Sequence, residues 1–145
     1  FNANTQEKLI FITKFGKGFI SISENMITNQ KKGKNIINLK DSDELLNVHH
    51  YKNNHLALIS KNQKLLIFDT SILPTLNKGT GVQLMKIKEK DSIIDSSLFD
   101  LKEGLFWSKG SKFKSLKDID FWIGKRAQVG KKIPKGFNKS LKFNI

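Results

Sequence analysis

Short apolar runs, bounded by Lys, Asn, Ser and Gly, recur along the whole chain, and few exceed seven residues. Runs of this length that are rich in Ile, Leu, Phe and Val are typical of β-strands. Helix signals are weak, and the two most helical pieces, 69–73 and 117–122, are each long enough for a single turn. The pattern therefore predicts an all-β fold. Its clearest elements are three hairpins with strands at 8–13 and 18–22, 55–60 and 64–69, and 105–108 and 112–116.

The three hairpins are evenly spaced along the chain. The lysines of their turns are 47 residues apart between the first and second hairpins and 48 between the second and third, and each hairpin is followed by a segment rich in Lys and Gly. An apolar run comes next, for example 35–39 and 82–87. A period of about 40–50 residues with four short strands per unit is typical of blade architectures. We therefore expect one domain over residues 1–145, built from about three four-stranded antiparallel blades with approximate repeat boundaries 8–54, 55–102 and 103–145.

Basic residues outnumber acidic ones by 26 to 13, which gives a net charge of +13. The excess is concentrated in residues 102–145, which hold twelve basic and three acidic residues. A field of one sign destabilises a compact chain by self-repulsion, and a polyanion would offset that repulsion. With 38% hydrophobic residues the chain is too apolar for a disordered basic tail. The charge therefore favours a folded domain with a partner rich in phosphate.

Other kinds of chemistry are disfavoured by the residues present. The sequence has no cysteine, which excludes disulfides, thiolate zinc sites and cysteine nucleophiles. His49 and His50 would point to opposite faces of a strand, and no suitably spaced carboxylate completes a metal site with them and His55. The longest apolar runs span four residues, too short for a membrane helix. We expect no catalytic residue, no metal and no membrane partner in this chain.

Two segments resemble a known family. Residues 30–35, Gln-Lys-Lys-Gly-Lys-Asn, resemble a shortened form of the box Q-R-R-G-G-K-G in the C-terminal domain of the gyrase A subunit. Residues 122–131, Trp-Ile-Gly-Lys-Arg-Ala-Gln-Val-Gly-Lys, and 133–137, Ile-Pro-Lys-Gly-Phe, resemble the C-terminal end of the topoisomerase IV A subunit (ParC) from alphaproteobacteria. The resemblance covers about residues 8–143. Because the complete gyrase box is absent, topoisomerase IV is the better match, and we expect a C-terminal piece of a longer polypeptide.

The resemblance implies a fold and a function. The family's domain is a β-pinwheel, a propeller-like ring of blades whose outer rim binds and bends duplex DNA. The parent enzyme would be a cytoplasmic, nucleoid-associated bacterial type II topoisomerase that uses ATP and Mg²⁺ to relax supercoils and to unlink daughter chromosomes. Partners would be double-stranded DNA, the rest of ParC and the ATPase subunit. The domain would need no cofactor, and the catalytic tyrosine would lie elsewhere, since Tyr51 follows a histidine and the family's nucleophile follows an arginine.

Basic residues on loops and turns are the candidate DNA contacts. Glycine lets a loop backbone approach phosphates closely, and lysine meets a phosphate as a point charge without reading bases. Since Arg126 is the only arginine and bidentate guanine readout relies on arginine, we expect binding that is independent of sequence. In order of preference the candidates are Lys31, Lys32 and Lys34, then Lys125, Arg126, Lys131 and Lys132, then Lys14, Lys17, Lys61, Lys64, Lys78, Lys109 and Lys112.

Two other functions stay open from the sequence. One is a propeller-like module that binds an acidic protein, which predicts salt-sensitive binding without dependence on duplex length. The other is an RNA-binding β-barrel, which would prefer single strands or A-form helices through aromatic stacking. The aromatic residues of the strand runs are expected in the core instead: Phe11, Phe19, Phe68, Phe106, Trp107, Phe113 and Trp122.

Overall fold

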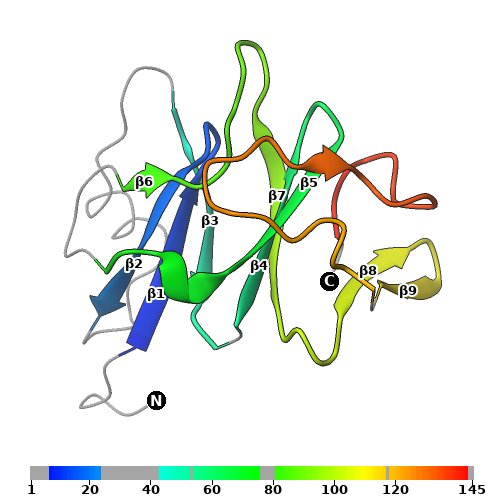
Figure 1. Cartoon of the computed structure of the whole chain (residues 1–145), viewed down its shortest axis with the longest axis horizontal. Helices are drawn as coiled ribbons and strands as arrows, with labels where there is room; N and C mark the ends of the chain where they lie inside the picture. The colour runs from blue at the N-terminus through cyan, green and yellow to red at the C-terminus, as the bar shows by residue number, and fades with distance from the viewer. Residues whose placement is uncertain (1–6, 24–42, 53, 76–80, 117, 144–145) are drawn as a thin grey trace.

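The computed structural model describes residues 7–23, 43–52, 54–75, 81–116 and 118–143. In these residues the secondary structure is almost entirely β, so the predicted fold class is confirmed (Figure 1). The elements are β1 (Glu7–Thr13), β2 (Lys17–Ser23), β3 (Leu45–His50), β4 (His55–Ser60), β5 (Lys64–Asp69), the 3₁₀ turn η1 (Thr70–Ile72), β6 (Val82–Gln83), β7 (Ile93–Phe99), β8 (Leu105–Lys109), β9 (Lys112–Leu116) and β10 (Lys131–Lys132).

The strands form two four-stranded antiparallel sheets of the same design. The first sheet has the order β3-β1-β2-β6, and the second has the order β7-β4-β5-β10. In each, a hairpin occupies the centre, and a two-residue strand lies along its second strand. In the chain, that short strand follows the next hairpin. β6 comes after β4 and β5 but pairs with β2, and β10 comes after β8 and β9 but pairs with β5. Each sheet is therefore completed by residues of the following repeat.

The third sheet is smaller than the predicted blade. Among the described residues it contains the hairpin β8-β9 alone. One backbone hydrogen bond, from the Ser108 N–H to the Phe143 carbonyl at 2.8 Å, brings the C-terminal segment alongside β8. No described strand pairs with the outer edge of β9, the edge that corresponds to those covered by β6 and β10 in the other sheets.

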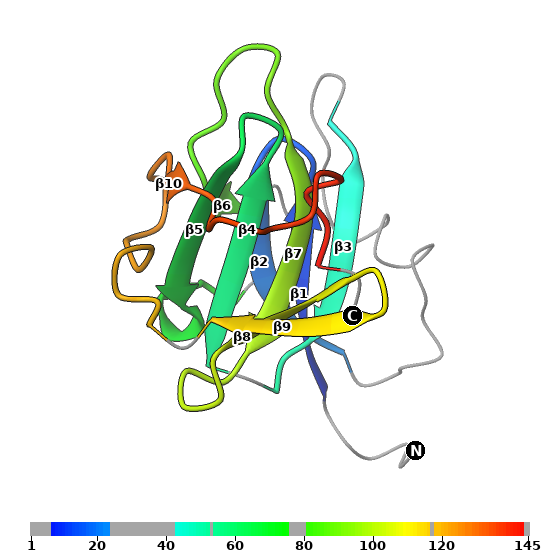
Figure 2. The same cartoon turned by 90° about the vertical axis from the view of Figure 1, so that its right-hand side faces the viewer.

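The second sheet is buried on both faces. Leu56 and Leu58 of β4 pack in a core shared with the first sheet, whereas Ala57 and Ile59 pack in a second core with the third sheet and the C-terminal segment. Residues 65–68 of β5 divide between the two cores in the same way. Strands covered on both sides read as continuous apolar runs. The three sheets are therefore stacked layers, with the second sheet in the middle (Figure 2).

Aromatic residues fill the second core, with two departures from the prediction. Trp107 packs against Phe137 with 5.0 Å between ring centroids, and Phe137 meets Phe143 edge-on at 5.5 Å. Phe113, however, is 64% exposed, and the half-buried Phe106 belongs to neither core, so both predicted core positions are wrong. The register of the hairpin pairs Phe113 with Ser108, which puts Phe113 and Phe106 on the sheet face opposite Trp107.

Candidate nucleic-acid interface

Residues 124–130 form a loop along the outer edge of β5, and we call it the 124–130 loop. At its start the Gly124 N–H donates to the Ile67 carbonyl at 2.8 Å, and the Ile67 N–H donates to the Trp122 carbonyl at 3.1 Å. At its end β10 pairs with β5, with Lys131 opposite Leu65. Because both ends are fixed on one strand, the residues between them bulge outward from the sheet.

The first sheet has the same attachment. The Ile20 N–H of β2 donates to the Pro74 carbonyl at 2.9 Å, as Ile67 does to Trp122. The segment that follows then returns to the edge of β2 as β6. The two attachments are therefore structural equivalents. In the first sheet, residues 76–80 lie outside the described residues, together with candidate Lys78.

The 124–130 loop also joins the second sheet to the first. The Ala127 N–H donates to the Leu84 carbonyl at 2.9 Å, and the Lys86 N–H donates to the Gln128 carbonyl at 2.9 Å. Arg126, which is half-buried, donates from Nη1 to the carbonyl oxygen of Gln83 at 3.0 Å. One guanidinium N–H is therefore committed to the protein, and the other donors of the group remain for a ligand.

A hollow of about 360 Å³ lies between the loop and the sheet. Leu66, Trp122 and Ile123 give it apolar walls, and Lys86 and Lys131 bring two cations to it. Apolar atoms suit a sugar ring, and ammonium groups suit the phosphates on either side of it. The chemistry of the hollow therefore matches the sugar–phosphate backbone of a nucleic acid.

Lysines face one another across the edge of the second sheet. Lys132 of β10 lies directly opposite Lys64 of β5. Like charges in directly opposed positions destabilise an antiparallel pair. At the equivalent position of the first sheet, Lys17 lies opposite the neutral Gln83. An anion bound between Lys64 and Lys132 would relieve the repulsion, so this edge is suited to a phosphate.

These basic residues lie on four segments at one end of the molecule. We call the four segments, residues 14–17, 61–64, 84–91 and 124–132, the lysine end. The β1–β2 turn, the β4–β5 turn and the β6–β7 connection lie side by side there (Figures 1 and 2). Backbone hydrogen bonds join them, from Ile93 to the Lys14 carbonyl at 2.7 Å and from Lys61 to the Ser92 carbonyl at 2.8 Å. The four segments hold eleven basic residues against two acidic ones.

The structure brings together most of the described candidates and adds three. Lys86, Lys88 and Lys90 are exposed residues of the lysine end that were not predicted, because they lie neither in a hairpin turn nor in a Gly-bearing loop. Their alternation with Ile87 and Glu89, which begins at the end of the 82–87 run and continues past it, was the available signal. The candidates at the lysine end are Lys14, Lys17, Lys61, Lys64, Lys125, Arg126, Lys131 and Lys132.

Other candidates lie elsewhere. Lys109 and Lys112 form the last pair of the β8–β9 hairpin, whose turn points away from the lysine end (Figure 2). Lys109 donates from Nζ to the Gly136 carbonyl at 3.1 Å. The most favoured candidates, Lys31, Lys32 and Lys34, lie outside the described residues.

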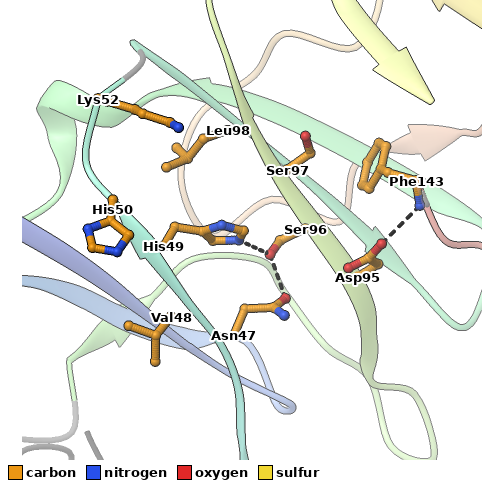
Figure 3. Close-up of a pocket in the computed structure, with 10 residues that line it drawn as sticks. All are labelled: Asn47, Val48, His49, His50, Lys52, Asp95, Ser96, Ser97, Leu98 and Phe143. Carbon is orange, nitrogen blue, oxygen red and sulfur yellow. Dashed lines mark hydrogen bonds between the residues drawn. The ribbon is translucent and has the colours of Figure 1, made fainter. Parts of the chain in front are cut away.

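A second cleft, of about 530 Å³, lies where β3 meets β7 (Figure 3). The His49 Nε2 atom is 2.7 Å from the Ser96 hydroxyl oxygen, and that hydroxyl donates to Asn47 Oδ1 at 2.6 Å. Because the hydroxyl hydrogen of Ser96 is used in the bond to Asn47, His49 Nε2 is the donor to the Ser96 oxygen. His49 therefore does not activate Ser96 as a nucleophile, and the three side chains serve as a hydrogen-bonded junction between the first and second sheets.

Burial lowers the pKa of His49 below its usual 6.5, an effect that the Asp95 carboxylate partly opposes and that neighbouring His50 reinforces. The unfolded chain therefore takes up a proton at His49 before the folded protein does as the pH falls. The contribution of His49 to the free energy of unfolding is fully present above about pH 6.5. It declines as the pH falls toward the pKa of His49 in the folded protein.

We expect His49→Gln to lose less stability on acidification than the wild type. The measurement is the free energy of unfolding in urea at about pH 7.5 and about pH 5.5, which lie on either side of the ordinary histidine pKa. His50→Gln, at an exposed position of the same strand, is the comparison: it removes an imidazole and only the smallest of the three influences on the His49 pKa, so most of the acid sensitivity should remain. Equal acid sensitivity of the wild type and His49→Gln would contradict the assignment to His49.

In the described part of the chain, no three His, Asp or Glu side chains gather closely enough to hold a metal ion. Among the same residues there is no helix of the length and apolar character that a membrane crossing requires.

Comparisons with known proteins agree with this geometry. The family model described as "DNA gyrase C-terminal domain, beta-propeller" matches residues 7–50 and 54–99. The A subunit of DNA topoisomerase 4 from Rickettsia bellii is 34% identical over 136 residues, which cover 94% of this chain and 18% of the relative. The chain thus spans about a fifth of the length of that relative.

Solved structures show the same fold. The crystal structure of the C-terminal domain of DNA topoisomerase IV has a TM-score of 0.69 at 24% identity, covering 89% of this chain and 42% of that one. The DNA gyrase A C-terminal domain has a TM-score of 0.70 at 24% identity, with coverage of 97% and 48%. Both support the β-pinwheel arrangement that the resemblance implied. By the family model and its curated relatives, this chain belongs to the C-terminal domain family of the DNA gyrase and DNA topoisomerase IV A subunits.

Proposed function

We propose that this domain binds and bends duplex DNA without sequence preference, using the lysine end as its contact surface. The observation that carries the proposal is the joining of eleven basic residues on four segments, with Lys64 and Lys132 directly opposed. A phosphate backbone supplies the missing countercharge at this surface. Contact along more than one face of the lysine end requires the duplex to curve around it, which is the physical basis for bending.

Independence of sequence follows from the kinds of side chain present. Ten of the eleven cations are lysines, which contact phosphates without a fixed geometry. The single Arg126 already gives one N–H to the Gln83 carbonyl. A bidentate contact to guanine needs two parallel donors from one edge of the guanidinium, which this hydrogen bond restricts. The surface therefore holds a duplex by its backbone.

The wider role belongs to the whole parent protein. We propose that the domain serves a bacterial type II topoisomerase, holding a DNA segment while the rest of its own polypeptide and a separate ATPase subunit relax supercoils and separate linked duplexes. The catalytic tyrosine, ATP and Mg²⁺ would belong to those other parts, and the complex would work in the cytoplasm at the nucleoid. Membership in the family supports this placement, with the topoisomerase IV A subunit as the type of parent.

The test is the affinity of the chain for a duplex of about 40 base pairs, measured across a salt series with two unrelated sequences. Neutralising five phosphates predicts a slope of log K against log [salt] of about −4.5, with the same value for both sequences. Single-stranded RNA of equal length is the competitor, because an RNA-binding barrel would prefer it. Absence of duplex binding at about 50 mM salt by the folded protein would overturn the proposal.

A further inference from the structure

Phe121 is an aromatic residue held at the surface beside the lysine end. Its side chain is 59% exposed. The ring meets Trp122 edge-on with 5.1 Å between centroids, and Lys131 Nζ lies 5.0 Å from the ring centroid. The turn beneath it is closed by a hydrogen bond from the Trp122 N–H to the Ile119 carbonyl at 2.9 Å. The ring is therefore supported from the protein side and open to solvent.

The equivalent position in the first sheet is buried. Leu73 directly precedes Pro74, whose carbonyl accepts a hydrogen bond from β2. In the same way Phe121 directly precedes Trp122, whose carbonyl accepts a hydrogen bond from β5. Leu73 is 6% exposed and belongs to the core between the first and second sheets. In the second sheet the core contact is made by Ile119, which is 1% exposed. Because Ile119 fills the core, Phe121 is not needed for packing.

Two neighbours of the ring, Trp122 and Lys131, line the hollow of the 124–130 loop. Ile123, another residue of the hollow, is 38% exposed, so the apolar surface continues from Phe121 into it. Cations flank this surface at Lys125, Lys131 and Lys132. An apolar surface between phosphate-binding cations matches the order of groups along a DNA strand, where sugars lie between phosphates.

We propose that Phe121 is an apolar contact to duplex DNA that packs on the deoxyribose wall of the minor groove and favours the bend. The proposal rests on the proposed function, because it takes duplex DNA as the ligand. A sugar contact at Phe121 holds the duplex against this side of the lysine end, so it favours the curved path around that surface. Sugars are the same at every step, so this contact keeps binding independent of sequence. Lys131 and its neighbours hold the phosphates on either side.

The test compares Phe121→Ala with Phe113→Ala on a duplex of about 40 base pairs that carries a fluorophore at each end. Phe113 is the matched control, since it is 64% exposed and meets Phe106 edge-on with 5.7 Å between centroids. We expect Phe121→Ala to weaken binding about fivefold, the order set by the apolar area lost, and to lower energy transfer between the duplex ends. The salt slope stays at the wild-type value, because no phosphate contact is removed. Phe113→Ala matches the wild type.

Several results overturn the proposal. One is a Phe121→Ala protein with wild-type affinity and bend. Another is a change in the salt slope, which would mean that the substitution acts through Lys131 and the phosphates. Phe121→Leu keeps an apolar side chain and is expected to retain most of the affinity, so it guards against a variant that fails to fold. If the wild type itself does not bind the duplex, the proposed function fails; if it binds and Phe121→Ala binds equally well, this inference alone fails.

Discussion

Replacing Lys125, Lys131 and Lys132 with glutamate is expected to lower the affinity for duplex DNA by at least about a hundredfold at about 0.1 M salt, since each lost phosphate contact removes roughly eightfold. All three side chains are exposed and lie on or next to the 124–130 loop. Charge reversal adds repulsion from the DNA to the loss of contacts. The loss should be equal for unrelated sequences, and the slope of log K against log [salt] should become shallower by about three contacts.

The matched control is the triple replacement of Lys109, Lys112 and Lys114 with glutamate. It changes the net charge by the same amount, and its three exposed positions lie on the β8–β9 hairpin. Long-range attraction alone would weaken binding equally in both triple variants, and the lysine end would then not be the contact surface. A strong effect of the first triple variant and a small effect of the second would locate the contact.

Replacing Gly130 with alanine is expected to lower the free energy of unfolding by roughly 2–4 kcal/mol, the sum of backbone strain and a steric clash. Gly130 has φ +90°, and a Cβ there would lie 2.7 Å from the Leu65 carbonyl oxygen. That oxygen belongs to the buried strand β5, so it cannot move aside easily. Urea unfolding measures the loss. Glycine is required at position 130 because the backbone passes close to β5 there. Its role is therefore not only to let the loop approach a phosphate.

Gly136 provides the control for this substitution. Its φ of +82° is similar, but a Cβ would meet nothing within 4 Å. Gly136→Ala should therefore cost only the backbone strain, about 1–2 kcal/mol. If the two alanine variants lose equal stability, the contact with Leu65 contributes nothing and φ alone explains the requirement for glycine.

The hairpins were predictable because local residues determine them. The bounds of β4 and β5 match the predicted strands, and η1 falls within the predicted turn 69–73, where Asp69 accepts from the Ser71 N–H at 2.8 Å. β3 and β7 were not predicted as strands. Their polar residues, such as Asn47 and Ser96, are satisfied across the cleft between two sheets, and that contact leaves no local pattern. The strand predicted at 82–87 ends at Gln83, because the next residues turn to meet the 124–130 loop.

The candidate site was predictable in its parts and not in its assembly. Lysines in turns and Gly-bearing loops were identified from residue type alone. Their meeting depends on β6 and β10, which are two residues long. Each pairs with a strand of the last hairpin but one before it in the chain. No periodicity shows a two-residue pairing with a strand so far back in the chain. Lys86, Lys88 and Lys90 join the site through that same crossing.

The two-residue strands β6 and β10 also determine the order in which the chain can fold during synthesis. Val82 and Gln83 complete the first sheet, but they leave the ribosome after the whole β4–β5 hairpin. Lys131 and Lys132 likewise appear after β8 and β9, long after the rest of the second sheet. A nascent chain therefore holds an unfinished sheet while it begins the next one. Translation cannot complete one layer before starting another, and assembly of this domain is interleaved.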